Sequence, residues 1–338
     1  MAARQTSVVL GYLGLQDAPR KRRDSSQTPG AWAGGVLRTN DGDVSVLVSQ
    51  EKWDKMKVLV KELRSVLVQD ATRMNRKQLE QIRGYLIHVV QTYHSMKPYL
   101  IGLHMTIDGW RSNRDADGWR LPDSFQRDVM ARNGGDAEWE TQSPDLEVPE
   151  EVAAVPRLKD DIEALEELCK LKAPPLRRVR CRKSGTVLYG FGDASGSAFG
   201  ATVQIDGNIH YQYGQWQANV TEEESSNWRE LDNVVEFVAD LVKGEDFRGF
   251  ELFIFTDNST AENAFWKGTS KSRKLYELVL RLRQLEQEHG LIVHVVHMSR
   301  KRMIAQGTGG LSRGDHSQGV MKGLGMFPFL PLHEDPLG

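Results

Sequence analysis

Three acidic residues occur where their side chains could act together. Asp193 and Asp257 each end a short apolar run that is typical of a buried strand, and Glu230 lies between them on a run with helical periodicity. Ligands of α/β sheets gather in the crevice beyond the strand ends. A carboxylate that is buried there needs a cation, a hydrogen-bond partner or water. We therefore expect the three side chains to meet at one edge of a sheet.

Such a cluster indicates a divalent cation. Carboxylates that converge repel one another, and Mg²⁺, with Mn²⁺ as the alternative, is the kind of hard cation that oxygen ligands bind. Two such ions about 4 Å apart can hold the attacking and leaving oxygens of an in-line phosphoryl displacement. A single aspartate of this kind could instead be a turn or helix-capping residue. The interpretation depends on all three acids occurring in one order of elements.

The elements that would position these acids follow the order β-β-β-α-β-α-β. Apolar runs predict strands at 187–192, 198–205, 209–213, 250–256 and 291–297. Apolar residues at helical spacing predict helices at 222–243 and 271–289. Asp206 and Gly207 form a predicted hairpin turn, and Gly290 ends the last helix. This order predicts an α/β fold, a mixed sheet with flanking helices.

The motifs around the acids resemble those of the ribonuclease H domains that are fused to retroelement reverse transcriptases. Residues 189–201 (YGFGDASGSAFGA) resemble the first strand pair of that family, and 226–231 (SNWREL) resemble its helix motif. Residues 255–259 (FTDNS) resemble the segment with the third acid. Residues 296–298 (VHM) and 310–313 (GLSR) resemble the last strand and its Leu-Ser-Arg stretch. The four pieces occur in the family's order.

The resemblance implies a ribonuclease H-like domain over residues 185–316. It implies a metal-dependent endonuclease that cleaves the RNA strand of RNA–DNA hybrids. Asp193, Glu230 and Asp257 would be its catalytic and metal-binding residues, and Asn258 would contact nucleic acid. Hybrid recognition would then depend on duplex shape and on 2′-hydroxyl contacts rather than on base sequence.

One position departs from the family's pattern. The family usually carries a fourth aspartate two residues before the leucine of Leu-Ser-Arg, and this chain has Gly309 there. Asp315 is the substitute that we expect as a further metal ligand. The departure leaves two alternatives open, a weakened or inactive nucleic-acid-binding remnant and a domesticated protein that uses the fold for partners only. His297 could shuttle protons, or it could be a hydrogen-bonded core histidine.

The amino-terminal half predicts a small β unit followed by helices. Strands are expected at 8–15, 31–38 and 44–48, helices from Glu51 and after Asn75, and a further segment at 99–107. Residues 12–14 (YLG), 84–86 (GYL) and 97–100 (KPYL) resemble the palm end and the thumb or connection region of gypsy-like and DIRS-like elements. No Tyr-X-Asp-Asp hairpin is present, so we expect no polymerase activity.

These observations predict four parts of the chain. A β-hairpin and helical thumb or connection-like region would span 1–110, and a linker with a short helix would span 111–184. The ribonuclease H-like domain would follow at 185–316, and a tail would span 317–338. The chain would be the carboxy-terminal piece of a retroelement polyprotein, or a truncated copy of one, with the remainder of that polyprotein as a partner.

Charge predicts where nucleic acid would be contacted. The formal net charge of the 338 residues is −2, so contacts with a duplex or hybrid must come from local patches. The clearest is the run Arg20, Lys21, Arg22 and Arg23. A second set of lysines, on the first predicted helix, comprises Lys52, Lys55, Lys57 and Lys61. The alternatives are a solvated loop for the run and solubility for the lysines.

Composition excludes several classes of protein. Two cysteines, Cys169 and Cys181, exclude a disulfide framework and a four-cysteine zinc site. No apolar run reaches the length of a membrane span, and the first residues lack the features of a secretory signal. We therefore expect an intracellular protein, cytoplasmic or nuclear, without a membrane partner.

Overall fold

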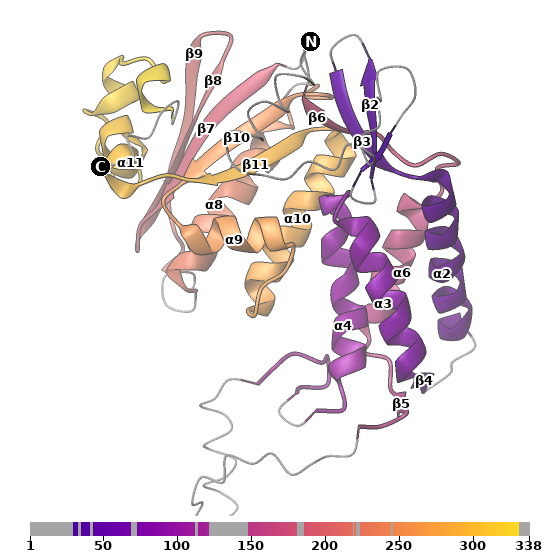
Figure 1. The fold of residues 1–338 in the computed structure, drawn as a ribbon. Helices are drawn as coiled ribbons and strands as arrows, with labels where there is room; N and C mark the ends of the chain where they lie inside the picture. The colour runs from indigo at the N-terminus through magenta and orange to yellow at the C-terminus, as the bar shows by residue number, and fades with distance from the viewer. Residues whose placement is uncertain are drawn as a thin grey trace, which may run out of the picture.

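The structure is a computed structural model, and it contains a mixed α/β part and a helical part that lie side by side (Figure 1). It describes residues 30–32, 35–40, 43–68, 73–111, 114–121, 148–180, 186–218, 220, 224–244 and 246–330. The predicted strand at 8–15, the basic run from Arg20 to Arg23 and Cys181 lie outside these residues.

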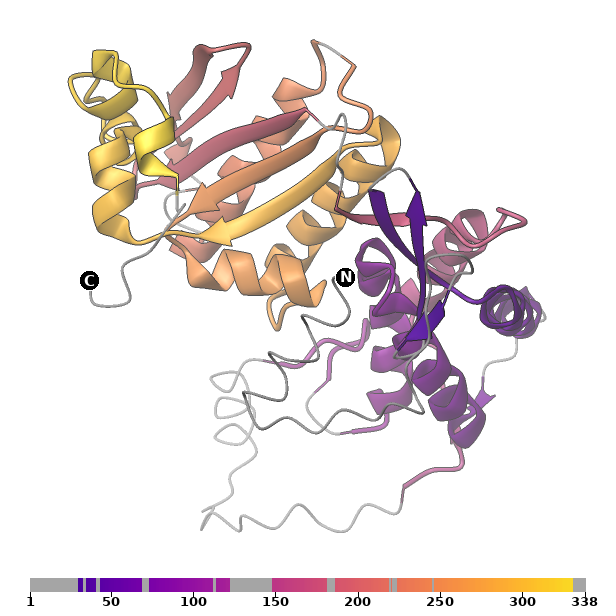
Figure 2. The same ribbon diagram turned by 45° about the horizontal axis from the view of Figure 1, so that its top comes forward.

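A five-stranded mixed sheet forms the α/β part, in the order β11-β10-β7-β8-β9. Its strands are β7 (Val187–Ala194), β8 (Ala198–Ile205), β9 (Asn208–Gln215), β10 (Glu251–Thr256) and β11 (Ile292–His297). β7, β8 and β9 pair antiparallel, whereas β10 is parallel to both β7 and β11. The arrowheads of β7, β10 and β11 therefore point the same way in Figure 2. The predicted fold class, α/β with a mixed sheet and flanking helices, is confirmed.

Two long helices, α8 (Ser226–Leu241) and α10 (Arg273–His289), pack together against this sheet (Figure 1). Both begin later than the sequence predicts, because a serine caps each of them. The side chains of Ser225 and Ser272 accept hydrogen bonds from backbone N–H groups of the first turn. Gly290 ends α10 as predicted, in the left-handed conformation with φ 61°.

Three shorter helices beside the sheet were not predicted. They are α9 (Ser259–Lys267), α11 (Arg300–Gln306) and α12 (Thr308–Leu311). Helices of one or two turns show too little periodicity for a sequence pattern to detect. Met303 of α11 belongs to the same buried cluster as Phe191 and Phe255 of the sheet, so this carboxy-terminal segment covers apolar surface. The 3₁₀ turns η3 (Gly319–Lys322) and η4 (Phe327–Phe329) follow α12.

The helical part carries a second, antiparallel sheet in the order β1-β2-β3-β6. These strands are β1 (Gly30–Trp32), β2 (Gly35–Asn40), β3 (Asp43–Val48) and β6 (Arg177–Arg180). Its helices are α2 (Gln50–Val68), α3 (Arg76–Val90), η2 (His94–Leu100), α4 (Ile101–Asp108) and α6 (Arg157–Leu168). Two short strands, β4 (Met74–Asn75) and β5 (Glu151–Val152), pair with each other. The single strand predicted at 31–38 is wrong, because this range contributes to the two antiparallel strands β1 and β2. The helices that follow β3 come in the predicted order, and Asn75 caps α3.

The helix α6 lies within the predicted linker, 111–184, and packs into the core of the helical part. Its residues Leu158, Ile162 and Leu165 share one buried cluster with Trp53 and other residues of α2 and α3. This linker therefore contributes to the helical core, although the predicted boundaries remain predictions. Within the described residues, no helix is long and apolar enough to cross a membrane.

Tyr276 joins the two parts. It lies on α10, but its fully buried ring belongs to the core of the helical part. Its hydroxyl donates a hydrogen bond to the backbone oxygen of Pro98 (2.7 Å) and accepts one from Arg157 Nη2 (2.6 Å). Arg157 also pairs with the buried carboxylate of Asp161 through Nε (3.3 Å). A continuous polar network therefore crosses the boundary between the two parts.

We expect Tyr276→Phe to lower the free energy of unfolding by about 1–3 kcal/mol, because the Pro98 carbonyl and the Arg157 guanidinium lose a buried partner. Urea unfolding followed by tryptophan fluorescence measures this change. Tyr211→Phe is the matched control, since Tyr211 is exposed, and it should change the free energy by less than about 0.5 kcal/mol. Equal effects of the two substitutions would contradict the network's role.

Candidate metal centre

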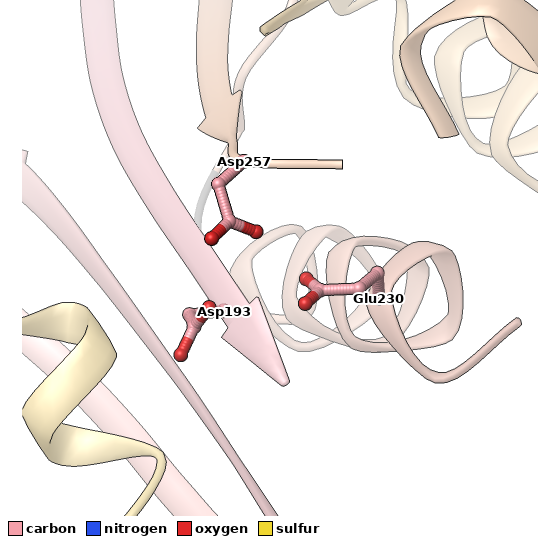
Figure 3. A group of neighbouring side chains, drawn as sticks. All are labelled: Asp193, Glu230 and Asp257. Carbon is pink, nitrogen blue, oxygen red and sulfur yellow. The ribbon is translucent and has the colours of Figure 1, made fainter. Parts of the chain in front are cut away.

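The three acids meet at one edge of the mixed sheet. One carboxylate oxygen from each of Asp193, Glu230 and Asp257 lies within 4.8 Å of the corresponding oxygens of the other two. Figure 3 shows the three side chains approaching a common space from three separate elements. The structure thus brings together residues that are far apart in the sequence, in the grouping that the sequence predicts.

Strand register brings the two aspartates together. β7 and β10 are parallel neighbours, and Phe191 pairs with Phe255 in their register. Two residues after each of these phenylalanines, Asp193 at the end of β7 and Asp257 just beyond β10 therefore come level at the same edge. The helix α8 begins near this edge, so Glu230, in its second turn, faces the two aspartates (Figure 3).

Burial makes this cluster electrostatically unfavourable without a cation. Asp193 is 4% exposed and Glu230 is 6% exposed, whereas Asp257 is half-buried. Burial, reinforced by the charges of Asp193 and Asp257, raises the pKa of Glu230 to about 9. Burial also raises the pKa of Asp193, although the hydrogen bond from Ser312 opposes this rise. The low-dielectric surroundings therefore penalise three ionised carboxylates at this edge.

The donors present fit a hard divalent cation. Among the described residues, Glu230 Oε2 is buried and has no hydrogen-bond partner, so it is an oxygen that the protein leaves available. Three converging carboxylates with such an atom are a typical environment for Mg²⁺ or Mn²⁺. The cluster therefore could hold a divalent ion, which would neutralise the repulsion among the three acids.

Hydrogen bonds from α8 and α12 fix Asp193. Ser312 Oγ donates to Asp193 Oδ2 (2.5 Å), and Asn233 Nδ2 donates to the backbone oxygens of Asp193 (3.2 Å) and Gly200 (2.9 Å). Ser195 Oγ in turn donates to the backbone oxygen of Ser312 (2.9 Å). Neither Asn233 nor the role of Ser312 was predicted from the sequence. A polar residue on the apolar face of α8, one turn beyond Glu230, was the signal for Asn233.

Asn258 connects two of the elements that carry the acids. Its Oδ1 accepts a hydrogen bond from the backbone N–H of Ala261 (2.9 Å), and its Nδ2 donates to Asn227 Oδ1 (2.9 Å). Asn258 therefore caps α9 directly after Asp257 and ties that segment to the first turn of α8. Its predicted contact with nucleic acid remains a prediction.

Asp315 lies apart from the cluster. Its Oδ1 accepts hydrogen bonds from the backbone N–H (2.8 Å) and hydroxyl (2.6 Å) of Ser317, and its Oδ2 accepts one from Gln318 (2.8 Å). These bonds hold the pKa of Asp315 below its usual value. In the described part of the chain, the group of acids that could share an ion contains Asp193, Glu230 and Asp257, and Asp315 does not belong to it.

Two other expectations have a structural outcome. His297 is exposed, so the prediction of a core histidine is wrong, and its backbone N–H donates to Glu262 Oε1 (3.0 Å). Three of the four lysines on α2 have protein partners, and Lys52 Nζ lies 2.9 Å from His88 Nε2. Lys55 lies over the ring of Tyr85 (4.7 Å), and Lys57 pairs with Asp54 (2.7 Å). Their contact with phosphates remains a prediction.

Comparisons with known proteins give fold neighbours only. No family model and no curated protein matches the chain. LC11-RNase H1 in complex with an RNA/DNA hybrid is 18% identical, with 38% of this chain and 94% of that chain covered and a TM-score of 0.31. RNase H1 from the archaeon Halobacterium salinarum is 17% identical, with 38% and 96% covered and a TM-score of 0.30. At these values, the similarity carries no argument about activity.

A longer match covers both parts of the chain. The foamy viral protease-reverse transcriptase in complex with an RNA/DNA hybrid is 12% identical, with 82% of this chain covered and a TM-score of 0.30. The chain spans about half of that protein, since 52% of it is covered. Because this score is also low, the functional proposal rests on the geometry of the acidic cluster.

We expect the metal-free protein to lose stability as the pH rises. Folded Glu230 holds its proton up to about pH 9, whereas its ordinary pKa is 4.5, so the folded state binds an extra proton between these values. Glu230→Gln should remove this loss and raise the free energy of unfolding at pH 7 by at least about 1.4 kcal/mol, the equivalent of one pKa unit.

Urea unfolding in chelator at pH 5, 7 and 8.5 measures this effect. Glu277→Gln is the matched control, because Glu277 is an exposed residue of α10 that pairs with Arg273 outside the cluster. The control should keep the wild-type pH dependence. A Glu230→Gln protein that loses as much stability as wild type between pH 5 and 8.5 would contradict the electrostatic description of the cluster.

Proposed function

We propose that this chain is a metal-dependent endonuclease that cleaves the RNA strand of RNA–DNA hybrids. The observation that carries the proposal is the convergence of Asp193, Glu230 and Asp257 within 4.8 Å at the carboxyl edge of a mixed sheet. A buried acidic cluster with an unpartnered carboxylate oxygen is costly for folding alone, which favours a role in binding a cation.

Asp193, Glu230 and Asp257 would hold Mg²⁺, or Mn²⁺, through one carboxylate oxygen each. A divalent ion bound there supplies Lewis-acid stabilisation of the reacting phosphate and lowers the pKa of bound water. The chain's own contribution is orientation. Ser312 holds one oxygen of Asp193, and Asn258 holds the segment after Asp257 against α8. Half-exposed Asp257 leaves the cluster open to a polymeric substrate.

The wider context is part of the same proposal. The chain would be a gypsy-like or DIRS-like reverse transcriptase fragment, with a palm end and a thumb or connection region at 1–110. The order of the described elements, a β-hairpin followed by helices, supports this part of the proposal. The partners would be hybrid or duplex nucleic acid and the remainder of a retroelement polyprotein. Such a protein would act inside the cell. Primer extension by the purified chain would contradict the expected lack of polymerase activity.

The second candidate function is that of a weakened or inactive remnant, which binds duplex nucleic acid without cleaving it. Gly309 favours it, because a glycine at this position offers no side-chain oxygen to a metal ion. Asp315 does not compensate in the structure, since its oxygens accept bonds from Ser317 and Gln318. The two candidates share the fold and differ in turnover, so a cleavage assay separates them.

We expect the chain to cleave a labelled RNA–DNA hybrid in Mg²⁺ or Mn²⁺ and to stop when a chelator is added. Asp193→Asn should lower the cleavage rate at least about 100-fold, since it removes a charged ligand from the ion. Asp240→Asn is the matched control, because Asp240 is an exposed residue of α8 that pairs with Lys243. Its rate should match wild type.

The outcomes of this assay separate the candidates. Binding of the hybrid without metal-dependent cutting would reject the nuclease and support the remnant. A chain that neither binds nor cuts would reject both and support a protein that uses the fold for other partners. Cutting that survives both the chelator and Asp193→Asn would show a contaminating activity and would remove the support for the proposal.

The basic run at Arg20, Lys21, Arg22 and Arg23 generates a separate prediction. If these side chains contact phosphates, replacing all four with Gln should flatten the dependence of the hybrid's binding constant on salt. The slope of log K against log[salt] should fall by about 0.7–0.9 for each phosphate contact that is lost. Fluorescence anisotropy at several salt concentrations measures it, and an unchanged slope would assign the run to a solvated segment.

A further inference from the structure

Arg313 places a positive charge beside the acidic cluster. Its Nη1 lies 3.7 Å from Asp193 Oδ2, and the same nitrogen donates a hydrogen bond to the backbone oxygen of Gly309. Ser312 Oγ donates to this Asp193 oxygen as well. The side of Asp193 that faces Gly309 is therefore already occupied by one hydrogen-bond donor, Ser312, and by the cation of Arg313.

The glycine at 309 is compatible with a larger side chain. A Cβ atom there would lie 3.5 Å from Ile304 and 3.6 Å from Arg313 Nη1, which are ordinary van der Waals distances. The residue is helical and does not require a positive φ. A carboxylate at this position would therefore fit, and it would come within ion-pairing distance of the Arg313 guanidinium.

Charge balance distinguishes one bound ion from two. An ion bound by Asp193, Glu230 and Asp257 would displace the proton of Glu230, so the three acids would then carry three negative charges. One divalent ion together with the Arg313 guanidinium carries three positive charges and neutralises them. A second divalent ion on the side of Gly309 would gain no carboxylate there and would face the guanidinium, so repulsion would oppose its binding. A site for two ions would need a further acid and the removal of this cation.

We propose that Arg313 takes the place of a second metal ion, so that Asp193, Glu230 and Asp257 bind a single divalent cation. The inference rests on the metal site of the proposed function. Arg313 is a positioning residue here, because it acts on the ion and on the substrate's charge through Asp193.

The test counts bound ions in the full chain without nucleic acid. Mn²⁺ is titrated into the protein, and free Mn²⁺ is measured by electron paramagnetic resonance. We expect one ion per wild-type chain. Gly309→Asp should also bind one, because the new carboxylate pairs with Arg313. The double variant with Gly309→Asp and Arg313→Gln should bind two ions and show the spin coupling of a close Mn²⁺ pair.

Arg313→Gln alone provides a second test if Gly309→Asp fails to fold. We expect this variant to fold, because the Arg313 side chain is 47% exposed. It should bind one Mn²⁺ about fivefold or more tightly than wild type, the size expected when a nearby positive charge is removed from a partly solvated site. Arg248→Gln is the matched control. Arg248 is exposed and pairs with Asp246, so its loss should leave both the count and the Kd unchanged.

Several results would overturn the inference. Two ions or none bound by wild type, a second ion bound by Gly309→Asp alone, or an Arg313→Gln Kd equal to that of the Arg248→Gln control would each do so. Failure of the proposed function gives a different result. A chain that binds one Mn²⁺ in the expected way but does not cut hybrids would reject the nuclease and leave the role of Arg313 intact.

Discussion

Mutual repulsion among three carboxylates is the constraint that organises this molecule. Asp193, Glu230 and Asp257 are held within 4.8 Å of one another although burial and their own charges disfavour ionisation. Such an arrangement persists only because parallel strands, a capped helix and a short carboxy-terminal helix over-determine it. Two large apolar clusters, one in the helical part and one in the mixed α/β part, stabilise the fold. Their stabilisation offsets the repulsion among the three carboxylates.

The residues around the cluster neutralise its three carboxylates to different extents. Asp193 receives the hydroxyl of Ser312 and faces Arg313, whereas Glu230 keeps a buried oxygen without a partner among the described residues. The protein thus neutralises one side of the cluster with its own groups and leaves the other side for an external cation. Gly309 lies on the neutralised side, since its backbone oxygen accepts a hydrogen bond from Arg313.

Sequence patterns predicted the strands and the long helices of the mixed sheet because apolar periodicity reports directly on burial. They also predicted the acidic cluster, since strand-end aspartates on parallel neighbours must come level. They missed α9, α11 and α12, whose few residues carry no periodic signal. Asp315 illustrates another limit. Proximity in sequence to the Leu-Ser-Arg stretch suggested a ligand, but local turn bonds from Ser317 and Gln318 decide where its carboxylate lies.

Tyr276 connects the helical part and the mixed α/β part. Because a residue of α10 completes the core of the neighbouring helical part, Tyr276 couples the orientation of the mixed sheet to that of the helices. If the helical part binds a duplex and the acidic cluster cleaves it, the distance between the binding surface and the cleavage site is set by the folded protein. The number of base pairs between the bound segment of the duplex and the cleaved phosphate would then be constant.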